Sequence, residues 1–304
     1  MTTSNTIYDK APTLASLAYM VASELKTIRE GTTTTASISA PVDTLRSEAA
    51  NYWRYGPFWV LYANGGSAPT GEYQNIASFQ GGTITLAASL SATIPSGARY
   101  AVGRRRFPLD VIIQNINSAY QELGTIPLVD ITSLATTANT TEYTIPQAAR
   151  NQLLQVWLQT EDTYTNVHGY IQIPHGQWRQ EMDTLYLPQL SSDSDIIKLV
   201  YADQPSMLVA YGDELSPYVH PSRVVFKAAA NVLMWRAERI NDTSTSNAIN
   251  QRVNYFLDLD QKAKYNHPIH MPKRQDFAAL VGMDFTGSRG GIRENVAPGY
   301  VNLD

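Results

Sequence analysis

The apolar residues of this chain change their spacing several times along its length. In four stretches they recur every three or four residues, which places them on one face of an α-helix: residues 12–29, 108–123, 217–241 and 245–264. Between these stretches, short β-prone runs are separated by glycine, proline and asparagine, which is typical of antiparallel strands joined by tight turns. The sequence therefore predicts an α+β fold that combines a bundle of about four helices with antiparallel β domains.

Proline and glycine mark where several of these helices begin and end. Pro12 lies at the start of the first helix and Gly31 follows its end, and Pro108 lies in the first turn of the second helix. Pro217 and Pro221 open the third helix, and the polar residues 241–244 separate it from the fourth. The last two helices are therefore expected to form an αα-hairpin.

Two groups of short runs are the candidate strands. The first group, within residues 64–103, indicates a small antiparallel sheet. The second, within residues 126–204, alternates between apolar and polar side chains, as a half-buried sheet does. The runs are 75–79, 83–86 and 100–102 in the first group, and 143–146, 153–159, 170–173, 184–187 and 196–201 in the second.

These patterns divide the chain into four segments. They are an N-terminal helix with its connector (1–54), a small antiparallel β insertion (55–106), a core of helix, β domain and αα-hairpin (107–265), and an extended C-terminal arm (266–304). The arm has no periodicity, and its composition alone is that of a disordered tail. Its spaced aromatic residues favour instead an arm that docks on a partner. The residues expected to dock are Phe277, Phe285, Arg289, Arg293 and Tyr300.

The composition excludes several classes of function. Cysteine is absent, so the chain has no disulfides, thiolate metal sites or cysteine nucleophile. A net charge of −4 argues against a protein whose main task is to grip nucleic acid. Only 16% of the residues are charged, against about 25% in an ordinary domain, so the surface is rich in uncharged polar groups that suit protein–protein contact. No apolar run is long enough to span a membrane, and residues 1–10 lack the pattern of a signal peptide.

Motifs of catalysis are missing. The sequence contains no phosphate-binding loop, dinucleotide fingerprint, nucleophile elbow or zinc-protease pair. His267 and His270 flank a proline in the expected arm, which does not favour a metal site, and His168 and His175 are expected at opposite ends of one strand. Paired aspartates at 193/195 and 258/260 fit solvated positions better than the facing acids of a glycosidase. We therefore expect no enzyme activity, no metal and no cofactor.

One cluster of charge stands out from this background. Arg99 is followed by Arg104, Arg105 and Arg106, where the first group of strands meets the second helix. Such a cluster could contact phosphate or an acidic partner surface, and the alternative is a patch that is solvated or bridges subunits. Without aromatic residues between the arginines, the cluster is weak evidence for binding of nucleic acid.

The order of these pieces resembles the head-to-tail adaptor (connector, or neck) proteins of tailed bacteriophages. The resemblance covers roughly residues 75–265 and rests on the succession of segments, because each alone is degenerate. The matching segments are Ser78–Leu86, Leu90, Ile94–Gly97 and Tyr100, then Arg106–Asp110 and the helix through Tyr120, then Thr140–Pro146, Ile171–Ile173, Lys198–Tyr201 and the terminal αα-hairpin.

The resemblance implies a structural virion protein of the neck, between capsid and tail, assembled in the host cytoplasm. Such proteins form a ring, commonly of twelve copies, that joins the portal protein to tail or nozzle proteins, extends the channel for transient passage of DNA and contacts no membrane. A C-terminal tail reaches the portal. A tail tube, nozzle or stopper component is the nearest alternative, and a glycan-binding tail module, suggested by the 18 tyrosines, is a more distant one.

Overall fold

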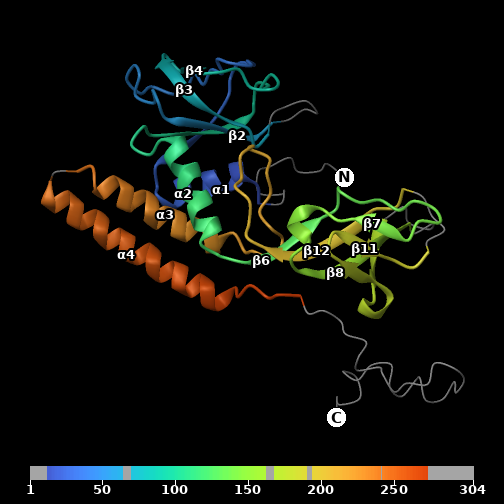
Figure 1. Ribbon diagram of the computed structural model, residues 1–304. Coiled ribbons are helices and arrows are strands. Elements are labelled where there is room, and N and C mark those ends of the chain that lie inside the picture. Colours follow the sequence, from blue (N-terminus) through green and yellow to red (C-terminus); the bar gives the residue numbers. More distant parts are fainter. Residues whose placement is uncertain (1–11, 64–69, 162–167, 190–193, 241, 273–304) are drawn as a thin grey trace, which may run out of the picture. The chain divides into compact units, whose positions relative to one another are not determined.

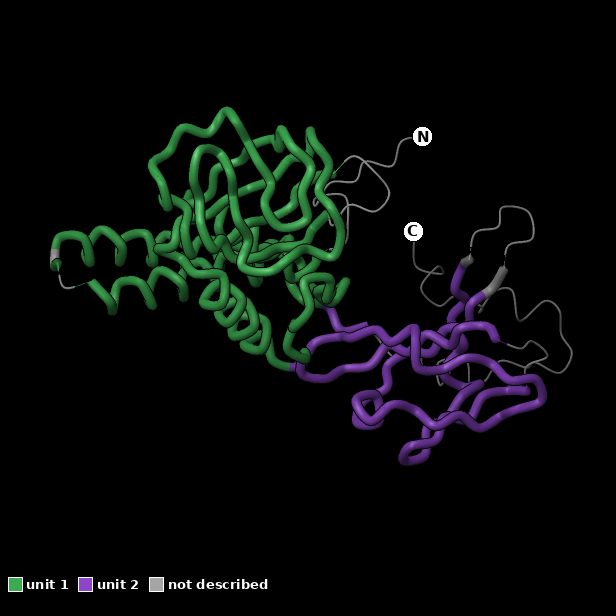
Figure 2. Tube along the Cα trace, turned by 90° about the horizontal axis from the view of Figure 1, so that it is seen from above, with its two compact units in different colours: residues 1–124, 205–269 green, residues 125–204, 270–304 purple. Residues whose placement is uncertain are grey.

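The chain folds into two compact units. The computed structural model describes residues 12–63, 70–161, 168–189, 194–240 and 242–272. Unit 1 comprises residues 1–124 and 205–269, and unit 2 comprises residues 125–204 and 270–304 (Figure 2). Unit 2 is therefore largely an insertion between the second and third helices of unit 1.

Unit 1 contains the four expected helices. They are α1 (Leu14–Glu24), α2 (Leu109–Gln121), α3 (Ser222–Ala237) and α4 (Thr243–Asn266). The apolar faces explain their packing: α2 buries Leu109, Ile112 and Ile116 on one side. Helix α3 packs against the other three helices, and α4 runs beside it as the second arm of the predicted αα-hairpin (Figure 1). The prediction of an α+β fold with about four helices is confirmed.

The first and third helices are shorter than their sequence patterns suggest. Helix α1 ends at Glu24, because Lys26 adopts a left-handed backbone conformation with φ of 54°, and Ile28–Thr32 then forms strand β1. Ile28 fits the helical spacing, but its backbone pairs with a strand instead. Helix α3 begins at Ser222 rather than at residue 217, with Pro221 as its N-cap.

The sheet of unit 1 has the strand order β1-β5-β2-β3-β4, with all neighbours antiparallel. Its central strand β2 is buried on both faces. One face, including Phe58 and Val60, belongs to a closed apolar core, and on the other Trp59 meets Tyr19 of α1 edge to face with ring centroids 6.1 Å apart. The strands after β1 are β2 (Pro57–Tyr62), β3 (Tyr73–Gln80), β4 (Thr83–Leu86) and β5 (Arg99–Gly103).

Unit 2 consists of two antiparallel sheets that share one core. Their orders are β6-β12-β8-β9 and β10-β11-β7, and Val156 and Leu199 of the first sheet join Tyr143 and Leu185 of the second in the core. The five predicted strands of this region are present. Strands β6 and β10 were not among them. Strand β6 contains Pro127, which a strand tolerates at a sheet edge, and β10 is a short run of polar residues. The strands are β6 (Ile126–Asp130), β7 (Glu142–Thr144), β8 (Leu153–Glu161), β9 (His168–Ile173), β10 (Arg179–Glu181), β11 (Thr184–Tyr186) and β12 (Ile197–Asp203).

Candidate interaction surface

The structure separates the predicted basic cluster into two parts. Arg99 begins strand β5, and Arg104–Arg106 follow its other end, so four strand residues lie between Arg99 and Arg104, at about 3.3 Å each. Arg104, Arg105 and Arg106 are all exposed, in the connection from β5 to α2. The residues expected to dock from the C-terminal arm (Phe277, Phe285, Arg289, Arg293 and Tyr300) lie outside the described residues.

Arg99 is neutralised by a carboxylate. Its guanidinium lies 2.5 Å from the Glu30 carboxylate, on the neighbouring strand β1. The other oxygen of Glu30 accepts a hydrogen bond of 2.6 Å from the Tyr19 hydroxyl. The Tyr19 hydrogen bond and, after it, Arg99 lower the pKa of Glu30 despite the opposing effect of burial. Arg99 therefore adds little net positive charge to the surface.

Pairing of strands β2 and β5 brings a second group of residues beside Arg104–Arg106. Residues 51–56 form the turn that enters β2, and an added Cβ on Gly56 would lie 1.9 Å from the Gly103 carbonyl oxygen, so the turn contacts the end of β5. Next to this contact in the sequence, Tyr52 of the turn and Arg104 after β5 form a pair, with the Arg104 guanidinium 5.6 Å from the centroid of the Tyr52 ring. Such stacking of arginine on an aromatic ring is favourable at exposed sites.

The same turn contributes another arginine–tyrosine pair. The Arg54 guanidinium lies 4.6 Å from the centroid of the Tyr55 ring, and 57% of Tyr55 is exposed. We call the combined set the arginine–tyrosine surface; it consists of Tyr52, Arg54, Tyr55, Arg104, Arg105 and Arg106. Within the described part of the chain, no carboxylate lies within 4.0 Å of any of its four guanidinium groups. Four uncompensated positive charges beside two exposed rings can bind carboxylates or phosphates and stack on planar or apolar groups.

A buried charged network supports the turn from within the sheet. All three guanidinium nitrogens of Arg46 donate hydrogen bonds: Nε to the Tyr100 hydroxyl, Nη1 to Glu48 at 3.0 Å, and Nη2 to the Glu30 carbonyl at 3.1 Å. The Tyr100 hydroxyl in turn donates to Asp43 at 2.6 Å. Burial, and then the hydrogen bond to Asp43, raise the pKa of Tyr100. Arg46, Tyr100 and Asp43 are joined by these hydrogen bonds inside the sheet, and one oxygen of Glu48 is buried without a hydrogen-bond partner among the described residues, so we assign the network to the fold.

The Arg46 network also fixes the base of the arginine–tyrosine surface. Its guanidinium lies 5.4 Å from the centroid of the Trp53 ring, and Trp53 is fully buried. The neighbouring Tyr52 ring meets Trp53 edge to face, with centroids 4.8 Å apart. Tyr52 is therefore presented to solvent from a rigid base.

The described surface also contains an open groove of about 500 Å³ along α2. Glu122 is the acidic residue in its lining and forms an ion pair of 3.1 Å with Lys227 of α3. The groove thus presents side-chain amides and the Ser118 hydroxyl, and its one carboxylate is paired with Lys227. Its lining residues are Gln114, Asn117, Ser118, Gln121, Glu122 and Met207.

The histidines do not assemble a metal site among the described residues. His168 and His175 lie at the two ends of β9, as predicted. His267, at the end of α4, stacks on His220 before α3, with ring centroids 3.7 Å apart. No group of three histidine or acidic side chains that could hold a metal ion occurs within the described ranges.

Comparison with known proteins adds no relative from which a function could be transferred. No protein-family model matches the chain, and no curated protein sequence matches it. Within the described part of the chain, none of the helices has the length and apolarity needed to cross a membrane.

Proposed function

We propose that this chain is a structural virion protein, an adaptor whose copies form a ring that joins the portal to the tail of a bacteriophage and extends the DNA channel. The order of the elements carries the proposal. A small sheet leads into α2, an antiparallel β unit follows, and an αα-hairpin closes the described chain. This is the succession on which the resemblance to the adaptor proteins rests.

The alternatives differ in what they require of the surface. A glycan-binding module needs an exposed aromatic cleft, and the groove along α2 contains no aromatic side chain. A tail tube, nozzle or stopper component would also assemble through contacts between its own copies. Such a component differs from an adaptor in the protein to which its assembly binds.

Native mass spectrometry and electron microscopy test the proposal. The chain is measured alone and after mixing with the portal protein encoded by the same genome. We expect closed rings, with twelve copies, bound to the portal. A chain that stays monomeric and does not bind the portal would refute the adaptor function, and rings that bind only tail proteins would favour the tube, nozzle or stopper role.

A truncated chain tests the arm. Removing residues 273–304 leaves α4 intact, because the helix ends at Asn266. If the arm docks on the portal, the truncated chain keeps its circular dichroism spectrum and its ability to form rings but loses portal binding. Unchanged portal binding would show that the arm is not the docking element.

A further inference from the structure

A ring of identical copies needs two different surfaces on each copy that fit each other, because a head-to-tail contact joins unlike patches. The arginine–tyrosine surface is one strongly positive patch without a described carboxylate partner. The counterpart must therefore offer carboxylates, with an apolar group that can contact Tyr52 and Tyr55.

The charge of the chain is distributed unevenly. Residues 125–204 contain nine acidic and three basic residues, a net charge of −6, whereas the whole chain carries −4. The remaining residues of the chain therefore carry a net charge of +2. Two opposite charge excesses on one chain favour association of unit 1 of one copy with unit 2 of another.

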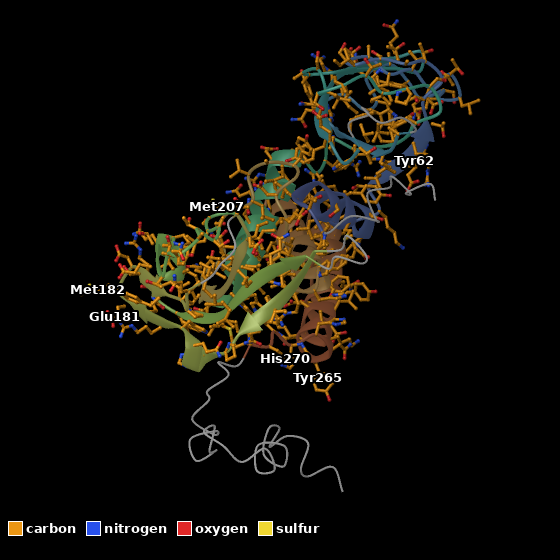
Figure 3. The ribbon with its side chains drawn as sticks, turned by 90° about the vertical axis from the view of Figure 1, so that its right-hand side faces the viewer. Tyr62, Glu181, Met182, Met207, Tyr265 and His270 are labelled. Carbon is orange, nitrogen blue, oxygen red and sulfur yellow. The ribbon has the colours of Figure 1, made fainter. Side chains whose placement is uncertain are left out.

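Within unit 2, the tip of the β10–β11 hairpin has the required chemistry. Glu181 and Met182 lie together at this tip, and Figure 3 labels both. Met182 is 90% exposed and is flanked by Glu181 and Asp183, whose side chains are about half exposed. The tip thus consists of one apolar side chain between two carboxylates.

Hydrogen bonds hold the turn at the hairpin tip although it is exposed. Met182 adopts φ of 52°, a left-handed conformation that residues other than glycine rarely take. The Gln180 side-chain amide holds this turn by donating to the carbonyl oxygens of Met182 at 3.2 Å and Arg150 at 2.6 Å. A fixed tip loses little conformational freedom on binding, which favours a docking role.

The carboxylates of the tip are only weakly engaged within their own unit. Glu181 lies 3.5 Å from Arg179, and Asp183 lies 4.0 Å from Arg150. All four side chains are at least 41% exposed, so these ion pairs contribute little and can be exchanged for others.

We propose that the hairpin tip Glu181–Met182–Asp183 of one copy docks on the arginine–tyrosine surface of the next copy in the ring. The inference rests on the adaptor function proposed above and names the contact that closes the ring. The two carboxylates pair with Arg54 and Arg104–Arg106, and Met182 contacts the tyrosine rings, as thioethers favourably do. A nucleic acid is the less favoured ligand, because its binding to the arginine–tyrosine surface would leave the exposed, acidic hairpin tip without a role.

Complementary charge reversal tests the contact with the full chain. One variant is R104E/R105E, the second is E181K/D183K, and the control R239E/K262E makes the same change in charge as the first at exposed positions outside both surfaces. Association is measured by sedimentation velocity at 50 and 500 mM NaCl, with and without portal protein. All substituted side chains are exposed, so circular dichroism spectra should be unchanged.

Each reversed variant alone should associate about 30-fold or more weakly than the wild type, and the control should match it. An equimolar mixture of the two variants should restore much of the association. The unchanged tip of R104E/R105E then meets the unchanged surface of E181K/D183K, and the glutamates introduced at 104 and 105 can pair with the two introduced lysines. M182S, which leaves the charge unchanged, should weaken association about fivefold to tenfold. Wild-type association should weaken in 500 mM NaCl.

Two results would overturn the inference: wild-type association by R104E/R105E, and failure of the mixture to associate. If R104E/R105E associates normally but loses binding to a 30-base-pair DNA duplex, the surface is a nucleic-acid contact. Rings that persist in all variants would refute this contact alone, whereas a wild type that neither associates nor binds portal would also refute the adaptor function.

Discussion

The substitution Arg46→Met should destabilise unit 1 far more than loss of a surface charge does. The Arg46 side chain is only 6% exposed, and its removal leaves the buried Asp43 carboxylate without a cationic partner and Glu48 with only the exposed Arg29. Removing one member of a buried ion pair costs about 3–5 kcal/mol, because the remaining charge is desolvated without compensation. Tyr100→Phe removes only a hydroxyl and keeps the stacking on Phe58, so about 1–3 kcal/mol is expected.

Urea unfolding followed by tryptophan fluorescence measures these effects. With an m-value of about 2 kcal/mol per molar urea, Arg46→Met should lower the midpoint of unit 1 by about 1.5–2.5 M. The matched control is Arg29→Met, whose side chain is 60% exposed and pairs with the same Glu48 at 3.6 Å; about 0–1 kcal/mol is expected. If Arg46→Met costs no more than this control, the network does not stabilise the sheet as argued.

Three further predictions follow from individual contacts. Burial, and after it the nearby His267, lower the pKa of His220, so His267→Gln should raise this pKa toward 6.5 in an NMR titration. A lowered pKa means that the fold favours neutral His220. The stacked contact between the two rings should therefore weaken as the pH falls below about 6.5. Hydrogen bonds from Thr245 lower the pKa of Asp242, the N-cap of α4, to about 2. The cap should therefore persist above about pH 4 and be lost as the pH falls through about 2, which a carboxyl titration by NMR would detect. Gly56→Ala should cost about 1–3 kcal/mol in thermal unfolding because its Cβ would overlap a backbone carbonyl, whereas Gly212→Ala, with open space around it, should be nearly neutral.

Local sequence patterns predicted most of the elements in this fold. Helix α2 was predictable because Leu109, Ile112 and Ile116 define one face, and β4 because glycines bound a short β-prone run at Thr83–Leu86. The end of α1 was not, since Ile28 satisfies the helical spacing and only its pairing with Gly103 makes it a strand residue. The spacing of apolar residues alone therefore does not show whether a residue such as Ile28 continues a helix or begins a strand.

The candidate surface depended on contacts between distant residues. The arginines were visible in the sequence, but Tyr52 and Arg104 are brought together only by the antiparallel pairing of β2 with β5. The sequence placed Arg99 in the same cluster, but its ion pair with Glu30 on β1 neutralises its charge. The hairpin tip at Met182 carried no sequence signal either, because a left-handed methionine replaces the glycine that would mark such a turn.

The insertion of unit 2 between α2 and α3 has a consequence for synthesis on the ribosome. Helices α1 and α2 both pack against α3, yet α2 ends at Gln121 and α3 begins at Ser222. At about 5–20 residues per second, the apolar face of α2 is synthesised roughly 5–20 s before that partner, and the apolar face of α1 roughly 10–40 s before it. During this interval unit 2 can complete its own fold, while the nascent helices depend on each other or on a chaperone for protection from aggregation.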